Sequence, residues 1–207
     1  MPTDTEAEIR RRLGRPAVEV APDVLGWRLS HTTTDGTVTV LLTEVEAYEG
    51  GTDPASHAYR GRTTRNAVMF GPAGHLYCYF SYGMHWCANL VCGPDGLASA
   101  VLLRAGRVVE GVELARQRRP GAADRDLARG PARLTTTLGI GRVDNGADLL
   151  GGRSLRLEPA HHDAAVSQGP RVGVSRAADR PWRFWLADDR TVSPYRRSPR
   201  ADDNELA

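Results

Sequence analysis

"HLYCYFSYGMHWCANLVCGPDGLASAVLLRAG", residues 75–106, predicts three short strands joined by two turns. Residues 75–81 and 85–92 are rich in apolar and aromatic side chains, and the glycine in the "SYGM" between them permits a sharp turn. "PDG" then separates the second strand from a third, over residues 97–106. Because strands joined by turns this short run antiparallel, the stretch predicts the centre of an antiparallel sheet.

A further strand is predicted upstream, at residues 36–48. Alternate side chains of a strand point to the same face, so the apolar residues at positions 38, 40 and 42 should share one buried face. The same alternation places Glu44, Glu46 and Tyr48 next on that face. Carboxylates at the end of a buried strand, beside an aromatic ring, suggest the edge of a pocket rather than more core.

The rest of the chain combines a long loop, helices and short strands. Residues 52–74 form a polar loop, and a loop this long in a compact domain is usually functional or mobile. Helices are expected at residues 108–119 and 132–140, and short strands near residues 154–159, 171–175 and 182–187. Residues 1–15 and 193–207 are expected to be a flexible arm and a flexible tail around one domain, residues 16–192. The fold class is therefore mixed α/β, a single domain with a mostly antiparallel sheet flanked by helices.

The composition narrows the kind of protein. The chain has 207 residues, 41% of them hydrophobic and 25% charged, which is typical of a soluble globular domain, and no apolar run is long enough to span a membrane. The cysteines, Cys78, Cys87 and Cys92, follow neither a disulfide framework nor a zinc-binding pattern. We therefore expect reduced thiols and no metal site.

The charges are unevenly distributed along the chain. Residues 55–145 carry 12 arginines and 6 acidic residues, a balance of +6, whereas residues 1–54 carry 5 arginines and 10 acidic residues, a balance of −5. A basic central segment is compatible with a polyanionic partner, and equally with an ordinary solvated surface. All 27 basic residues are arginine, so no side-chain amine is present that could form a Schiff base.

Five side chains differ in chemistry from their surroundings. Two charged residues end apolar strands, an amide interrupts one, a histidine lies in the long loop, and a tyrosine lies at the hairpin tip: Glu46, Arg104, Asn89, His57 and Tyr82. Each has an ordinary structural interpretation, such as a solvated edge acid, a hydrogen-bonded core amide or a tyrosine folded back on its strand. The functional interpretation is a pocket with a water-activating carboxylate, beside an aromatic hairpin that wedges into a base stack.

Six motifs, in their order and spacing, resemble the alkyladenine (3-methyladenine) DNA glycosylase family, the animal-type methylpurine DNA glycosylases. They are "TEVEAYEG", "DPASHA", "RTTRNAVMF", "GHLYCYFSYGMHWCANLV", "VLLRA" and "GPARLTTTLGI". The resemblance runs from about residue 21 to residue 187. It implies a curved sheet whose β-hairpin prong inserts into DNA.

By position, the resemblance also implies how a base would be bound and released. Glu46 corresponds to the glutamate that activates water, and Arg104 to the arginine that helps to hold that water. The flipped base would stack between Tyr48 and His57 on one side and Tyr79 on the other.

Further residues would act on the DNA around the damaged base. The resemblance implies that Asn89 crowds the exocyclic amine of guanine-like bases, and that Tyr82 intercalates where the nucleotide leaves the stack. Arg62 and Arg65, in the basic segment, are expected to bind phosphates.

The implied activity is that of a monofunctional DNA glycosylase. Such an enzyme hydrolyses the N-glycosidic bond of an alkylated or deaminated purine in duplex DNA, the first step of base excision repair. Without lysine, no strand-cleaving lyase step is expected, and no cofactor, metal or membrane partner is implied. A monomer is expected, in the cytoplasm at the nucleoid if bacterial and in the nucleus if eukaryotic. Two alternatives stay open: a non-catalytic sensor that binds damaged DNA, and a hydrolase of free nucleosides.

Overall fold

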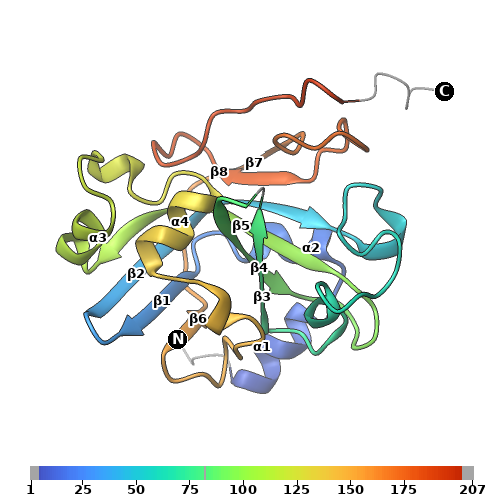
Figure 1. Ribbon diagram of the computed structural model, residues 1–207, viewed down its shortest axis with the longest axis horizontal. Coiled ribbons are helices and arrows are strands. Elements are labelled where there is room, and N and C mark those ends of the chain that lie inside the picture. Colours follow the sequence, from blue (N-terminus) through green and yellow to red (C-terminus); the bar gives the residue numbers. More distant parts are fainter. Residues whose placement is uncertain (1–4, 82, 202–207) are drawn as a thin grey trace.

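An antiparallel sheet forms the framework of the molecule (Figure 1), whose computed structural model describes residues 5–81 and 83–201. Its strands are β1 (Arg28–Thr33), β2 (Gly36–Tyr48), β3 (Leu76–Ser81), β4 (His85–Val91), β5 (Ala100–Glu110), β6 (Leu155–Glu158), β7 (Val166–Gly169) and β8 (Arg183–Leu186). They follow the order β3-β4-β5-β2-β1-β6, with β8 paired to β2 and β7 to β8. Each of these pairings is antiparallel, which confirms the predicted mixed α/β domain.

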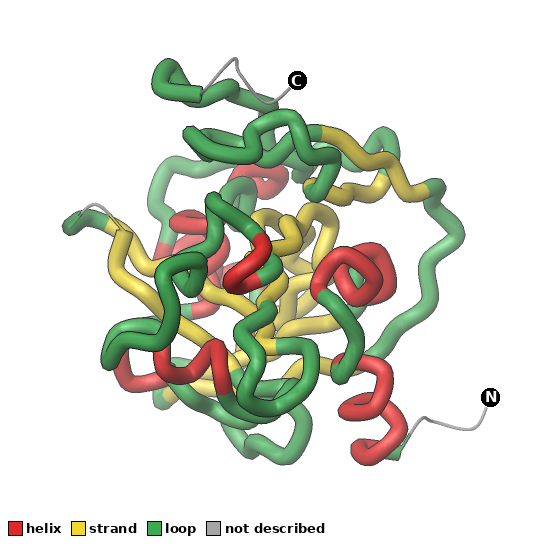
Figure 2. Tube along the Cα trace, turned by 90° about the vertical axis from the view of Figure 1, so that its right-hand side faces the viewer, coloured by secondary structure: helices red, strands yellow, loops and turns green. Residues whose placement is uncertain are grey.

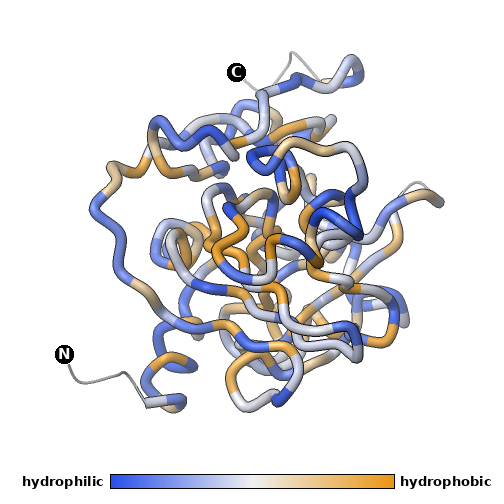
Figure 3. Tube along the Cα trace, turned by 90° about the vertical axis from the view of Figure 1, so that its left-hand side faces the viewer, coloured by the Kyte–Doolittle hydropathy of each residue, from blue (hydrophilic) through white to orange (hydrophobic). Residues whose placement is uncertain are grey.

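Short helices pack around the strands. They are α1 (Glu6–Leu13), α2 (Ala17–Asp23), α3 (Val112–Arg118) and α4 (Pro131–Leu138), with 3₁₀ turns at Gly50–Thr52, Ala67–Phe70, Asp124–Asp126 and Arg142–Asp144. Each α-helix contributes buried side chains to the main core cluster, for example Leu13, Val20, Ala115 and Leu134. Figures 2 and 3 show the helices around the strands and the hydrophobic segments gathered between them. Within residues 5–81 and 83–201, no helix has the length and apolar character needed to cross a membrane.

Helix α1, Glu6–Leu13, lies within residues 1–15, for which the sequence predicted a flexible arm. Ile9 and Leu13 lie four residues apart, on one side of the helix, and both are buried in the core. Arg10 also donates a hydrogen bond to Asp148, 2.6 Å away. The many charges of the segment masked a short amphipathic helix that is attached to the domain.

An irregularity in β2 reverses the alternation of its side chains. The pairing of β2 with β5 shifts register twice between Leu42 and Val45. Before the shift, the side chains at positions 38, 40 and 42 belong to the main core cluster, and after it Val45 and Ala47 do. The prediction that the two acids and the tyrosine continue the core face is therefore wrong. The bulge turns them to the opposite face of the sheet.

Several other segments differ from the prediction. The helix expected at residues 108–119 begins only at Val112, as α3, because residues 108–110 belong to β5. Gly111 makes the turn at a φ of +72°, and a Cβ there would lie 2.1 Å from the carbonyl oxygen of Thr37. Residues 171–175 form no strand, since Arg171 turns inward to bind Asp53. The sequence also gave no indication of α2, β1 and β7.

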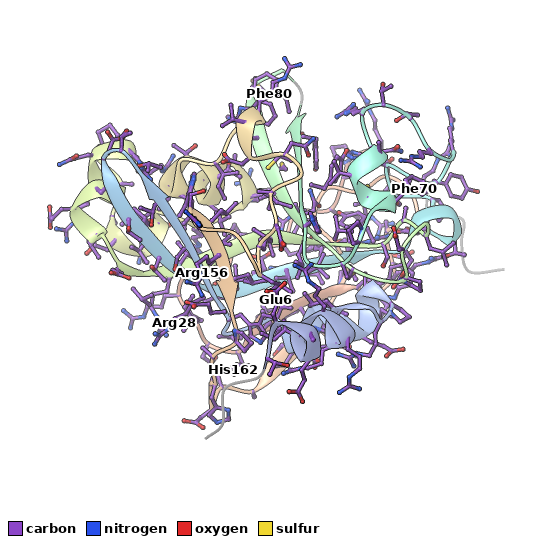
Figure 4. All side chains as sticks on the ribbon, turned by 90° about the horizontal axis from the view of Figure 1, so that it is seen from below. Glu6, Arg28, Phe70, Phe80, Arg156 and His162 are labelled. Atoms are coloured by element: carbon purple, nitrogen blue, oxygen red, sulfur yellow. The ribbon has the colours of Figure 1, made fainter. Side chains whose placement is uncertain are left out.

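Strands β3 and β4 form the predicted hairpin, which projects from the body of the molecule (Figures 2 and 4). Near its end, Phe80 and Met84 are 45% and 65% exposed, which is unusual for large apolar side chains. Gly83 adopts a φ of +67°, a conformation that favours glycine. Tyr82, the predicted tip residue, lies outside the described residues.

Candidate active site

One row of residues across the sheet carries much of the predicted site. Tyr77 pairs with Asn89, Asn89 with Leu102, Leu102 with Glu46, and Glu46 with Arg183. Side chains directly opposite each other on antiparallel strands lie on the same face. The row therefore brings β3, β4, β5, β2 and β8 together on the face that the core cluster does not use.

A pocket of about 580 Å³ lies over this row, within the usual size range of small-molecule sites. Its walls come from the sheet, the 54–69 loop, the start of α4 and residues 172–175, and they include Tyr48, His57, Tyr79, Asn89 and Arg104. Two larger hollows, of about 760 and 920 Å³, both include residues 161–162 and border none of these five side chains.

Glu46 lies one layer below the pocket surface. It is fully buried, whereas Tyr48 and Arg104, which contact it, line the pocket. Tyr48 donates its hydroxyl hydrogen to Oε2 at 2.9 Å, and the Val172 N–H donates to Oε1 at 2.7 Å. Nη1 of Arg104 lies 3.3 Å from Oε1. Because a carboxylate offers about four acceptor positions, these three contacts from the described residues leave one of them without a donor.

The Tyr48 hydroxyl is held in its protonated form. Burial, together with the neighbouring Glu46 carboxylate, raises the pKa of Tyr48 well above its ordinary value. The phenol therefore stays a hydrogen-bond donor to Glu46 throughout the physiological pH range.

A second buried carboxylate, Glu44, fixes Arg104. Its Oε1 accepts hydrogen bonds from Nε of Arg104 at 2.8 Å, Nε of Arg183 at 2.7 Å and Oγ of Ser193 at 2.9 Å, and its Oε2 accepts from the Ser193 N–H at 2.7 Å. Burial alone would raise the pKa of Glu44, but the two arginines and the Ser193 N–H outweigh it and lower that pKa. Glu44 is therefore ionised at neutral pH and directs Nη1 of Arg104 toward Glu46.

Arg104 itself is strongly cationic. Burial opposes its charge, but the carboxylates of Glu46 and Glu44 raise its pKa above the ordinary arginine value. Ser193, which begins the segment expected to be a free tail, is buried in this network, so the domain extends at least to that residue.

Aromatic rings form one side of the pocket. The rings of His57 and Tyr79 meet edge to face, with centroids 4.4 Å apart, and Tyr77 lies 5.7 Å from Tyr79. Nδ1 of His57 is 3.3 Å from the Tyr77 hydroxyl. Burial and the nearby Arg65 guanidinium lower the pKa of His57, so its imidazole is neutral at pH 7. The resemblance grouped His57 with Tyr48, whereas here its ring contacts Tyr79.

Asn89 is both a hydrogen-bonded buried amide and a residue of the pocket wall. Its Nδ2 donates to the carbonyl oxygen of Tyr77 at 3.0 Å, as a buried amide requires. It is 5% exposed and also lines the pocket. The hydrogen bond fixes which way the carboxamide faces.

The two predicted phosphate-binding arginines lie on the exposed 57–66 loop. Arg65 borders the pocket, with its guanidinium carbon 5.7 Å from the centre of the Tyr79 ring. Arg62 lies over the ring of Phe70, at 5.9 Å (Figure 4 labels Phe70). Asn66 shapes this loop, because its Nδ2 donates to the carbonyls of two loop residues, at 3.0 Å each, and its Oδ1 accepts from a third at 2.6 Å.

The sequence assigned no role to several residues that hold the site together, although it placed Glu44 beside the pocket. They are mostly charged side chains that are almost fully buried: Glu44, Asp53, Arg171, Arg183 and Ser193. A signal existed for two of them, because Glu44 and Asp53 stand in the motifs "TEVEAYEG" and "DPASHA". In the described ranges, 5–81 and 83–201, no group of His, Cys, Asp and Glu side chains is arranged to hold a metal ion.

The pocket is lined by aromatic rings that can stack on a planar ring, and a buried carboxylate lies beneath it, so the site fits an enzyme that acts on a base. The comparison with protein families names that enzyme class. The chain belongs to the methylpurine-DNA glycosylase (MPG) family, whose model matches residues 11–190, and it is a DNA glycosylase.

Bacterial proteins named "Putative 3-methyladenine DNA glycosylase" align with most of the chain. The Streptomyces avermitilis protein is 56% identical over 194 residues, covering 90% of this chain and 91% of its own. The Nocardia farcinica protein is 58% identical over 182 residues, covering 84% and 86%. The Burkholderia lata protein is 49% identical over 183 residues, covering 86% and 87%.

Proposed function

We propose that this DNA glycosylase flips an alkylated or deaminated purine out of duplex DNA and hydrolyses its N-glycosidic bond, with Glu46 as the group that activates water. The observation that carries the proposal is the position of the Glu46 carboxylate. It lies directly beneath a pocket that tyrosines line, and it touches both Tyr48 and Arg104. A carboxylate in this position has a protonated phenol and a guanidinium to orient it.

Binding begins with the DNA backbone and the hairpin. Arg62 and Arg65 neutralise phosphates and set the register of the duplex. Tyr82 enters the stack and occupies the space of the extruded nucleotide, and the exposed side chains of Phe80 and Met84 lie two residues to either side of it in the sequence. Unstacking a nucleotide costs a few kcal/mol and costs least at a damaged base, so this step favours lesions.

The flipped purine is then held by stacking. It lies against Tyr48 on one side and against Tyr79 and His57 on the other, and base–aromatic stacking contributes about 1–3 kcal/mol per base. The lowered pKa of His57 supports this step, because a neutral imidazole does not repel a base that alkylation has made cationic.

Hydrolysis uses the buried charges. Glu46 accepts a proton from a water that Arg104 helps to hold, and that water attacks C1′ of the sugar. The Glu46 carboxylate also stabilises the positive charge that develops on the sugar as the base leaves. The products are a free base and an abasic site. The chain contains no lysine, so no side-chain amine is available for a strand-cleaving lyase step at that site.

The test is base release from duplexes that carry one defined lesion. Duplexes with 3-methyladenine, 7-methylguanine, ethenoadenine or hypoxanthine are incubated with excess protein, and the free base is measured by chromatography. Release of at least one of these bases, with an intact but alkali-labile strand, is the expected result. Tight binding of lesion DNA without release of any base would refute the proposal and favour a damage sensor. Hydrolysis of the free nucleosides alone would favour a nucleoside hydrolase.

A further inference from the structure

Arg171 has no part in the steps above, although it is among the largest side chains that are fully buried. Its guanidinium donates to both carboxylate oxygens of Asp53, from Nη1 to Oδ2 at 2.5 Å and from Nη2 to Oδ1 at 2.9 Å. Asp53 is also fully buried, and the N–H groups of Ala55 and Glu49 donate to it. The pair is therefore fixed on both sides.

The same guanidinium contacts the end of β2. Nη1 donates to the carbonyl oxygen of Ala47 at 3.0 Å, and Ala47 is the residue between Glu46 and Tyr48. The guanidinium carbon lies 4.6 Å from the centre of the Tyr48 ring and 5.2 Å from that of Trp182. The guanidinium of Arg171 thus lies over two aromatic rings, and the Tyr48 ring borders the pocket.

The backbone links Arg171 to the carboxylate as well. Val172, the next residue, donates its N–H to Oε1 of Glu46 at 2.7 Å and lines the pocket. The Arg171 side chain therefore contacts the Ala47 carbonyl and the Tyr48 ring, and the Val172 N–H contacts the Glu46 carboxylate.

Stability alone does not account for this arrangement. The desolvation of a buried ion pair offsets much of its attraction, so such pairs contribute little net stability. The Nε of Arg171 is in addition buried without a hydrogen-bond partner among the described residues, which is a cost. Arg171 is fully buried and does not line the pocket. Its contacts lead to the pocket through Tyr48 and Val172, and through Asp53 to the backbone of Ala55.

We propose that Arg171, held by Asp53, is a positioning residue: it fixes the plane of the Tyr48 ring and keeps the Tyr48 hydroxyl on Glu46. This inference rests on the proposed function, because it needs Glu46 as the group that activates water. The guanidinium covers one face of the Tyr48 ring and leaves the other for a base. Lysine cannot replace it, since a single ammonium group lacks the planar fork that binds Asp53 and stacks on the rings.

The experiment compares Arg171→Lys with a matched control, Arg10→Lys. Arg10 also forms an ion pair, with Asp148, but borders none of the pocket. For each protein we would measure unfolding, affinity for a duplex with an abasic-site analogue, and the single-turnover rate of base release by the folded fraction. Arg171→Lys should lower that rate about tenfold or more, because misplacing reacting groups by about 1 Å costs up to about 10²-fold. Affinity for the abasic duplex, which leaves the base pocket empty, should be unchanged, and Arg10→Lys should change neither quantity.

A double-mutant cycle tests whether Arg171 acts through Tyr48. If it does, Arg171→Lys should lower the rate far less in a Tyr48→Ala background than in the wild type. Equal reductions in the two backgrounds would overturn the inference, as would a wild-type rate for Arg171→Lys.

A second variant, Asp53→Asn, tests the role of Arg171 if Arg171→Lys does not fold. It keeps the shape of Asp53 and removes the charge that holds the guanidinium. It should lower the rate with the same dependence on Tyr48, and a wild-type rate would overturn the inference. The two proposals fail differently: absence of base release by the wild-type protein would refute the proposed function, and the inference with it, whereas a normal rate in these variants refutes the inference alone.

Discussion

Replacing Glu44 with glutamine should destabilise the protein more than any other single charge-neutralising change in the site. Glu44 is fully buried, and four hydrogen bonds converge on its carboxylate, two of them from the Nε atoms of Arg104 and Arg183. Glutamine can accept with one oxygen only, and its amide nitrogen turns hydrogens toward groups that are themselves donors. Arg183 would then lose the carboxylate with which it is paired, and Arg104 would keep only that of Glu46.

The size of the effect follows from this geometry. Removing one partner of a buried ion pair costs about 3–5 kcal/mol, because it leaves an uncompensated charge. For a domain of this size each kcal/mol lowers Tm by about 2–4 °C, so Glu44→Gln should lower Tm by roughly 6–20 °C. Urea or thermal unfolding at pH 7 measures the loss. Glu49→Gln is the matched control, because within residues 5–81 and 83–201 the donors to the Glu49 carboxylate are the neutral Val18 N–H and Ser99 Oγ.

The pH dependence adds an independent check. The pKa of Glu44 is lower in the folded protein than in the unfolded chain, so its contribution to stability is complete above the unfolded value. That contribution is lost as the pH falls through the folded pKa, where the wild-type carboxyl group becomes protonated. The stability difference between wild type and Glu44→Gln should thus be constant above about pH 4.5 and shrink below it. A loss at pH 7 no greater than that of Glu49→Gln would refute the reasoning.

Three further predictions concern the pocket and the hairpin. Asn89→Ala should raise release of 7-methylguanine relative to ethenoadenine, because a side chain that crowds the 2-amino group is removed; an unchanged ratio of single-turnover rates would reduce Asn89 to a core amide. Tyr82→Ser should slow excision most for lesions that remain well paired, and equal losses at paired and mismatched lesions would exclude a wedge. The pKa of His57 is lowered, so its imidazole gains a charge only as the pH falls below the ordinary histidine value of about 6.5. Below that pH, the wild-type rate of release of cationic 7-methylguanine should fall relative to that of neutral ethenoadenine. His57→Gln should keep that rate ratio constant over the same range, and a ratio that falls equally in both proteins would assign the effect to another group.

The sequence predicts those strands of the sheet that are rich in apolar residues and end at a turn. The hairpin of β3 and β4, the long β2 and the start of β5 all lie where apolar runs end at glycine or at a turn. The bulge in β2 could not be predicted, because it arises from the pairing of β2 with β5, which no local pattern records. Helix α1 was missed because eight residues with two buried side chains are dominated by their exposed charges.

Some residues of the site could likewise be predicted from the sequence, and others could not. Residues whose chemistry contrasts with a local run, such as Glu46, Asn89 and Arg104, are found by that contrast, and the structure brings all three to one face. Arg171 stands in the short motif "RVGVS", which predicts a strand, and its partner lies 118 residues away in the sequence. Only the folded chain reveals such a pair, because a buried arginine and a solvated one look alike in sequence.

Single-turnover base release by Glu46→Gln tests the central claim most directly. Glutamine keeps the shape of the side chain and can still accept a hydrogen bond from Tyr48, but it can neither take a proton from water nor carry the negative charge that stabilises the sugar cation. Affinity for a duplex with an abasic-site analogue is measured in parallel, to show that the variant folds and binds DNA. The account predicts that this affinity is retained while base release is lost. Base release near the wild-type rate would contradict it, and would mean that another group activates the water.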